Sequence, residues 1–178
     1  MLIAKVTSPE PGVDALVIFD RDGTLSEDYG PMHGNSICTI LPGVMEGLKT
    51  LVNPKTVFAI ATNQSYVGRG ELRIADVEAF NAKLLLLLDA VSIKINYIAI
   101  CPHTAEEGCA CRKPNPGMID ELIRISGIQD RERIFFVGDK TSDEKAAVAS
   151  GVVSLSLQNM SFGIACNQIK RLLKSEGT

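Results

Sequence analysis

Short apolar runs alternate with amphipathic stretches along the chain. Four runs are apolar without interruption and short enough for strands, namely residues 15–19, 57–61, 97–100 and 134–137, and residues 152–157 form a fifth run that contains two serines. Uninterrupted runs rich in valine and isoleucine are typical of strands that are covered on both faces of a parallel sheet. The pattern therefore predicts five buried strands.

Helical periodicity fills the segments between these runs. It predicts helices over residues 44–51, 74–91, 116–126, 142–150 and 164–174. Glycine follows the third and the fourth of these segments, and proline begins the third, as is usual at helix ends. Strands that alternate with helices predict an α/β fold with a doubly wound, mostly parallel sheet. We expect a single domain over residues 1–178, because this length leaves no room for a second large one.

Polar residues gather where the predicted strands end. The segments after the first four runs are residues 20–24, 62–65, 101–113 and 138–140. In an open α/β sheet, ligands bind beyond the carboxyl ends of the strands. We therefore expect these segments to meet in one crevice that is rich in carboxylates, hydrogen-bond donors and cations.

Three carboxylates are expected in this crevice. Asp20 and Asp22 are two residues apart, so an extended segment presents both on one side, and Asp139 follows another strand. One carboxylate can attack phosphorus while a second moves a proton. Because three acids would repel one another, the arrangement predicts a hard cation such as Mg²⁺ among them.

The same crevice offers groups that suit a phosphate. Thr62 supplies a hydroxyl donor, Lys113 a point charge and Arg112 a planar fork. Gly23 lets the loop turn and brings backbone N–H groups near an anion. A single Asp-x-Asp-Gly also occurs in turns and calcium loops, so the order of the motifs, rather than any one of them, indicates phosphoryl transfer.

A second constellation consists of Cys101, His103, Cys109 and Cys111, four candidate metal ligands in the loop 101–111. Three thiolates and one imidazole form a closed tetrahedral zinc site, and closed sites are structural. Ordinary buried cysteines beside a surface histidine are the alternative, which the close spacing disfavours. Because residues 104–108 have little apolar content, zinc would order this loop and so position the basic pair that follows it.

Charge and hydropathy exclude several classes of function. The net charge of −3 gives no basic footprint for nucleic acid, and the longest apolar run, residues 84–88, is too short to span a bilayer. No secretory signal is visible at the N-terminus. We expect a cytoplasmic monomer that acts on a small phosphate ester and binds neither nucleic acid nor membrane.

Four short motifs resemble those of the haloacid dehalogenase superfamily of phosphatases. They are FDRDGTL at residues 19–25, TNQ at 62–64, RKP at 112–114 and GD at 138–139. The cysteine loop and the Cys-Arg-Lys-Pro junction are similar to those of the heptose 1,7-bisphosphate 7-phosphatase and histidinol-phosphatase family. The resemblance implies a haloacid dehalogenase-like fold without a large cap domain, in which the flap after Asp22 and the zinc loop cover the site.

The resemblance also implies a role for each residue. Asp20 would be the nucleophile and Asp22 the general acid and base, while Thr62 and Lys113 would stabilise the phosphoryl group. Magnesium would be bound by Asp20, by the backbone carbonyl of Asp22 and by Asp139. The implied substrate-binding residues are Asp28, Tyr29, Gly30, Pro31, Asn63, Gln64, Ser65, Arg112 and Lys140.

The implied reaction is hydrolysis of the 7-phosphate of D-glycero-D-manno-heptose 1,7-bisphosphate through an aspartyl-phosphate. The chain departs from the family pattern in its short zinc loop, at residues 30–32 and at residues 66–67. These loops are expected to face the substrate, so histidinol phosphate stays open as the alternative. A zinc-stabilised binding module without catalysis is the more distant alternative. A 3′-phosphatase of nucleic acid shares the first motifs, but no basic groove for a strand is apparent.

Overall fold

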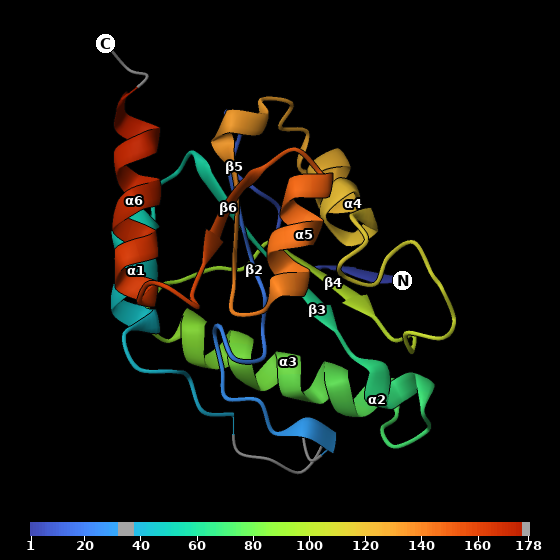
Figure 1. The fold of residues 1–178 in the computed structure, drawn as a ribbon. Coiled ribbons are helices and arrows are strands. Elements are labelled where there is room, and N and C mark those ends of the chain that lie inside the picture. Colours follow the sequence, from blue (N-terminus) through green and yellow to red (C-terminus); the bar gives the residue numbers. More distant parts are fainter. Residues whose placement is uncertain (32–37, 176–178) are drawn as a thin grey trace.

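The computed structural model describes residues 1–31 and 38–175, and it contains one six-stranded sheet between two layers of helices (Figure 1). The strand order is β1-β4-β3-β2-β5-β6. The strands are β1 (Leu2–Lys5), β2 (Ala15–Phe19), β3 (Thr56–Asn63), β4 (Tyr97–Cys101), β5 (Ile134–Gly138) and β6 (Val153–Ser156). All neighbouring pairs are parallel except β1 with β4. The predicted α/β fold with a mostly parallel sheet is confirmed.

The helices agree with the predicted segments to within two residues at each end. They are α1 (Val44–Leu51), α3 (Ile74–Asp89), α4 (Gly117–Ser126), α5 (Thr141–Ala149) and α6 (Phe162–Ser175), with the additional short helix α2 (Ser65–Gly68) and the 3₁₀ turn η2 (Arg131–Arg133). No helix within the described residues is both long and apolar enough to cross a membrane.

Strand β2 shows how the apolar pattern produces two helical layers. Val17 and Phe19 point to one face, where they pack with α1, α3 and α6. Leu16 and Ile18 point to the other face and pack with α4 and α5 (Figure 1). Successive side chains of a strand alternate between the faces, so a run that is apolar at every position must be covered on both.

Two strands differ from the prediction in ways that matter for the site. Strand β3 continues to Asn63, which lies in register with Cys101 at the end of β4. Thr62 and Asn63 therefore belong to the strand, because backbone pairing continues where the apolar pattern stops. Strand β1 was not predicted, since three of its four residues are exposed and its place depends on backbone pairing to β4.

Candidate active site

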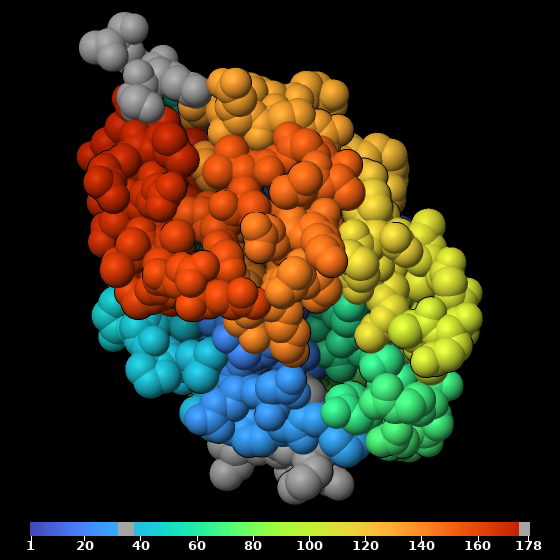
Figure 2. Space-filling model, viewed as in Figure 1, coloured from blue at the N-terminus to red at the C-terminus, as the bar shows by residue number. Residues whose placement is uncertain are grey.

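The polar strand ends meet in one cavity of about 330 Å³ at the carboxyl edge of the sheet. In Figure 2 the flap after β2 (blue), the segment around α2 (green) and the start of α5 (orange) lie next to one another on this face. The lining residues are Asp20, Asp22, Asp28, Asn63, Gln64, Ser65, Tyr66, Arg69, Arg112, Lys113, Lys140, Ser142 and Asp143. Loops that are far apart in the sequence thus converge as predicted.

A buried lysine lies between two buried carboxylates at the centre of the site. The Nζ atom of Lys113 is 2.5 Å from Oδ1 of Asp20 and 2.7 Å from Oδ1 of Asp143, and it donates a hydrogen bond to the carbonyl of Ala61. Burial raises the pKa of Asp20 to about 7; Lys113 opposes this shift, and Asp143 adds to it. Burial alone would lower the pKa of Lys113, but Asp20 and Asp143 raise it, so the lysine stays charged.

Three carboxylates can share a cation beside this lysine. Oxygen atoms of Asp20, Asp139 and Asp143 all lie within 4.8 Å of one another. A hydrogen bond from the Thr24 hydroxyl also reaches Asp139, at 3.3 Å. The donor set fits magnesium, which prefers hard oxygen ligands, and a cation would offset the negative charge that one lysine leaves uncompensated.

Gly23 permits this approach of the strand ends. A Cβ atom at this position would lie 2.5 Å from Oδ2 of Asp139, and its backbone φ of +87° is also one that side chains disfavour. The glycine of the Asp-x-Asp-Gly motif therefore keeps the loop of Asp20 against the loop of Asp139.

The sequence analysis gave Asp143 no role, although it lies four residues after Asp139. Asp139 directly follows β5, and Asp143 lies in the first turn of α5, where its carboxylate accepts a hydrogen bond from the backbone N–H of Lys140 at 3.0 Å. Asp22 was predicted to bind the metal through its backbone carbonyl, which stays a prediction. Its side chain is outside the group of three and instead accepts hydrogen bonds from Thr62 at 3.3 Å and Gln64 at 2.7 Å.

The end of β3 and the segment that follows it hold the loop of Lys113 and the side chain of Arg69. The Asn63 amide donates to the carbonyl of Lys113 and accepts from its backbone N–H, at 3.0 and 3.1 Å. The hydroxyl of Ser65 accepts from Arg69, whose guanidinium stands 4.3 Å from the ring centre of Tyr66. Sequence reasoning expected the loop of residues 66–67 to face the substrate, and Tyr66 does line the cavity. It gave no role to Arg69 or Ser142, because only the short helix α2 and the first turn of α5 direct them towards the site.

The flap residues 28–31 divide into two groups. Asp28 lines the cavity and forms an ion pair with Lys140 at 3.4 Å. The hydroxyl of Tyr29 instead donates to Thr39, and its ring packs edge-on against Phe80. Among the described residues, Gly30 and Pro31 also do not line the cavity. Residues 30–32 differ from the family pattern, and the last of them, Met32, lies outside the described residues.

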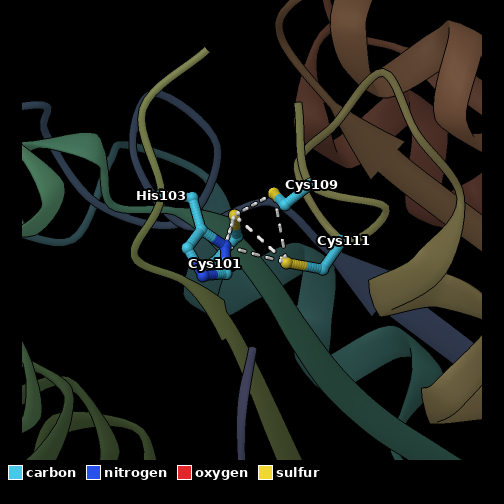
Figure 3. A group of neighbouring side chains, drawn as sticks. All are labelled: Cys101, His103, Cys109 and Cys111. Carbon is cyan, nitrogen blue, oxygen red and sulfur yellow. Dashed lines mark hydrogen bonds between the residues drawn. The ribbon is translucent and has the colours of Figure 1, made fainter. Parts of the chain in front are cut away.

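The predicted zinc ligands form one compact cluster (Figure 3). The Sγ atoms of Cys101, Cys109 and Cys111 lie 3.4 to 3.6 Å apart. The His103 Nδ1 atom is 3.5 Å from the first and 3.3 Å from the third. A tetrahedral zinc site with usual bond lengths would separate its ligand atoms by about 3.7 Å. The cluster therefore matches the edges of such a tetrahedron, and its donors fit zinc.

Burial opposes ionisation of the Cys101 thiol when no cation is bound. It raises the pKa of Cys101 to about 12. For Cys109 burial acts in the same direction, but hydrogen bonds, the strongest from Cys111, lower its pKa to about 7. A divalent metal would stabilise all the thiolates, which is how metal binding becomes linked to loop folding.

The backbone carbonyls of the cysteine loop accept hydrogen bonds from residues that line or border the cavity. Gln64 N–H donates to the carbonyl of Cys101 at 2.7 Å, and Gly68 N–H donates to that of Pro102 at 2.8 Å. Arg112 Nη1 donates to the carbonyl of His103 at 3.2 Å. The loop thus helps to position both the segment after β3 and Arg112.

Comparisons with known proteins agree with this geometry. The family model described as "Polynucleotide kinase 3 phosphatase" matches residues 15–167. The D-glycero-β-D-manno-heptose-1,7-bisphosphate 7-phosphatase of Pseudomonas putida is 36% identical over 141 residues, which cover 76% of this chain and 78% of that protein. The histidine biosynthesis bifunctional protein HisB of Campylobacter jejuni is 32% identical over 90% of this chain, but only 46% of that protein is covered.

A solved structure extends the likeness to three dimensions. The D,D-heptose 1,7-bisphosphate phosphatase of B. bronchiseptica, complexed with magnesium and phosphate, superimposes with a TM-score of 0.75 at 25% identity. The match covers 88% of this chain and 98% of that one. The chain therefore belongs to the polynucleotide kinase 3 phosphatase family of haloacid dehalogenase-like phosphatases, with heptose bisphosphate 7-phosphatases as relatives over about three quarters of its length.

Proposed function

We propose that the protein is a magnesium-dependent phosphatase that hydrolyses the 7-phosphate of D-glycero-D-manno-heptose 1,7-bisphosphate through an aspartyl-phosphate on Asp20. One observation carries the proposal. The Asp20 carboxylate lies at the tip of the central strand, against Lys113 and within reach of a cation site that includes Asp139 and Asp143. Phosphoryl transfer needs a positioned nucleophile and neutralised phosphate oxygens, and both are provided here.

The reaction has two balanced steps. In the first, an Asp20 oxygen bonds to phosphorus, the bond from phosphorus to the sugar oxygen breaks, and the Asp22 carboxyl gives its proton to that oxygen. In the second, the Asp22 carboxylate takes a proton from water, the water oxygen bonds to phosphorus, and inorganic phosphate leaves Asp20.

Three groups neutralise charge on the phosphoryl oxygens during both steps. Lys113 supplies a fixed positive charge, and the hydroxyl of Thr62 can donate a hydrogen bond from the end of β3. Asp20, Asp139 and Asp143 would hold magnesium, which would supply further positive charge to the phosphate oxygens.

The rest of the cavity fits a small anionic ester. Arg69, Arg112 and Lys140 add positive charge beyond Lys113, and Asp28 faces Lys140 across the opening. A second phosphate on the substrate would be attracted by this wall, whereas the ammonium group of histidinol phosphate would be repelled. The relatives support the same choice. The match covers 78% of the length of the Pseudomonas putida heptose enzyme but only 46% of the length of HisB.

A substrate panel tests the proposal. Phosphate release from heptose 1,7-bisphosphate, histidinol phosphate and a 3′-phosphorylated oligonucleotide is measured with magnesium and with EDTA. We expect kcat/KM for the heptose ester to exceed the other two by at least about 100-fold, which is about 3 kcal/mol of transition-state discrimination. Activity that persists in EDTA, or a preference for histidinol phosphate, would contradict the magnesium or the substrate assignment respectively.

A further inference from the structure

A fully buried arginine stands inside the Asp-x-Asp motif. The side chain of Arg21 is 0% exposed, and its Nε and Nη2 atoms donate to the two oxygens of Asp22, at 2.9 and 3.0 Å. The remaining nitrogen, Nη1, donates to Oδ1 of Asn81 at 2.7 Å. The guanidinium carbon lies 4.6 Å from the ring centre of Phe80. Both Asn81 and Phe80 belong to α3, which supplies no residue to the cavity.

Burying this charge is costly, and its geometry limits what it can do. A desolvated guanidinium is not a strong source of stability, because an apolar side chain of similar size often stabilises a core at least as well. Arg21 is not among the residues that line the cavity, so it cannot touch the substrate from this position. Its contacts instead hold one functional group, the carboxylate of Asp22.

The contacts fix the plane of that carboxylate. A guanidinium fork that meets both oxygens sets orientation as well as distance. Gln64 Nε2 adds a donor to Oδ2 of Asp22 at 2.7 Å, from the opposite segment of the site. Since Asn81 holds the far end of the guanidinium, a chain of contacts runs from α3 through Arg21 to Asp22. Such outer partners hold reacting groups within the narrow tolerance that catalysis requires.

We propose that Arg21, held by Asn81 and Phe80, is a positioning residue that orients the Asp22 carboxylate towards the leaving oxygen and the attacking water. The inference rests on the proposed function, because it assumes that Asp22 transfers the proton. It makes α3 a working part of the active site rather than only a cover for the sheet.

The test compares esters that differ in their need for a proton. An alkyl phosphate, such as the heptose ester, must have its leaving oxygen protonated, whereas 4-nitrophenyl phosphate releases a stable anion. In Arg21→Lys, which keeps the charge and loses the fork, we expect the single-turnover rate on the alkyl ester to fall by about 100-fold, the range typical of general acid catalysis. The first release of nitrophenolate should fall by less than about 5-fold.

The second step gives an independent readout. Because Asp22 must also activate water, Arg21→Lys should show a burst of one nitrophenolate per enzyme followed by slow turnover. Equal losses on both esters, without a burst, would mean that Arg21 only stabilises the fold and would overturn the inference.

Two further variants make the result decisive. Leu84→Ala on α3 removes a buried side chain from the same helix and should cost stability without changing the ratio of the two esters. If Arg21→Lys does not fold, Asn81→Ala is measured instead. We expect its rate on the alkyl ester to fall by about 10-fold and its rate of nitrophenolate release to fall by less. An unchanged ratio in Asn81→Ala would overturn the inference. Failure of the proposed function would be recognised separately. In that case wild-type protein would not hydrolyse the heptose ester, or Asp20→Asn would keep its turnover.

Discussion

Two candidate metal clusters lie at the same edge of this molecule, but different forces hold them in place. Two of the three carboxylates are buried. Asp20 comes directly after β2 and is 5% exposed, and Asp143 lies in the first turn of α5 and is 2% exposed. In the thiol cluster only Cys101 belongs to a strand, and residues 105–108 between its ligands are exposed. The first cluster is therefore positioned by the sheet and its core, whereas the second depends on what its own ligands bind.

This difference separates chemistry from folding. Removing a group from the carboxylate cluster should change turnover while the loops keep their positions. Removing a group from the thiol cluster should change loop order first and turnover second, through the contacts to Gln64, Gly68 and Arg112.

The largest effect is expected for Asp20→Asn. An amide cannot form the aspartyl-phosphate, so kcat should fall by at least about 10⁴-fold. Thermal unfolding with magnesium absent should show no loss of stability, and the zinc content should be unchanged. Substantial remaining turnover would contradict the assignment of the nucleophile, and loss of zinc would contradict the independence of the two clusters.

The next largest effect is expected for Cys109→Ser. Weaker zinc binding would release the loop and, with it, Arg112 and the segment after β3, so kcat/KM should fall by about 10- to 100-fold. Metal analysis and limited proteolysis within residues 104–108 measure the cause directly. Cys38→Ser removes a buried thiol outside the cluster and serves as the control, with zinc retained. Full activity and unchanged zinc content in Cys109→Ser would show that this thiol is not a ligand.

The sequence predicts the thiol cluster and two of the three carboxylates, Asp20 and Asp139, for local reasons. Apolar runs mark the strands, and the polar residues directly after them must lie at one edge of the sheet. The thiol cluster is predicted by spacing alone, since four ligands lie within residues 101–111. In both cases the information is contained in a few neighbouring residues.

What the sequence did not predict depends on contacts between distant segments. Arg21 lies inside the first motif, but its partner Asn81 is 60 residues away and looks like an ordinary polar residue of an amphipathic helix. Tyr29 was expected to face the substrate, whereas packing against Phe80 directs it elsewhere. Local pattern reports which residues are present at the site, but the orientation of each side chain is decided by the elements that pack against it.

A smaller effect is expected at the junction of the two clusters. Asn63→Ala removes both hydrogen bonds to the Lys113 backbone, each half-buried. The loss of about 1 to 2 kcal/mol of positioning energy should lower kcat/KM by about 10-fold and leave zinc bound. Asn53→Ala is the matched control, because Asn53 also bonds backbone groups but lies in a turn before β3. If Asn63→Ala lowered zinc content as strongly as Cys109→Ser, the two regions could not be regarded as separately held.

The smallest effect concerns the charge of Asp20 itself. Burial raises the pKa of this carboxyl from 3.8 to about 7, so between these values the folded protein binds a proton that the unfolded chain has released. Stability contributed by this group is therefore present at low pH and is lost as pH rises towards 7.

It follows that Asp20→Asn, which cannot ionise, should unfold at a higher temperature than wild type at pH 8 in EDTA. The difference should amount to a few degrees and should shrink at pH 4. Magnesium binds the ionised carboxylate and so should remove the advantage of the amide at pH 8. If the two proteins unfolded at the same temperature at both pH values, Asp20 would not carry a buried charge, and the cation would have no electrostatic cost to relieve at this strand tip.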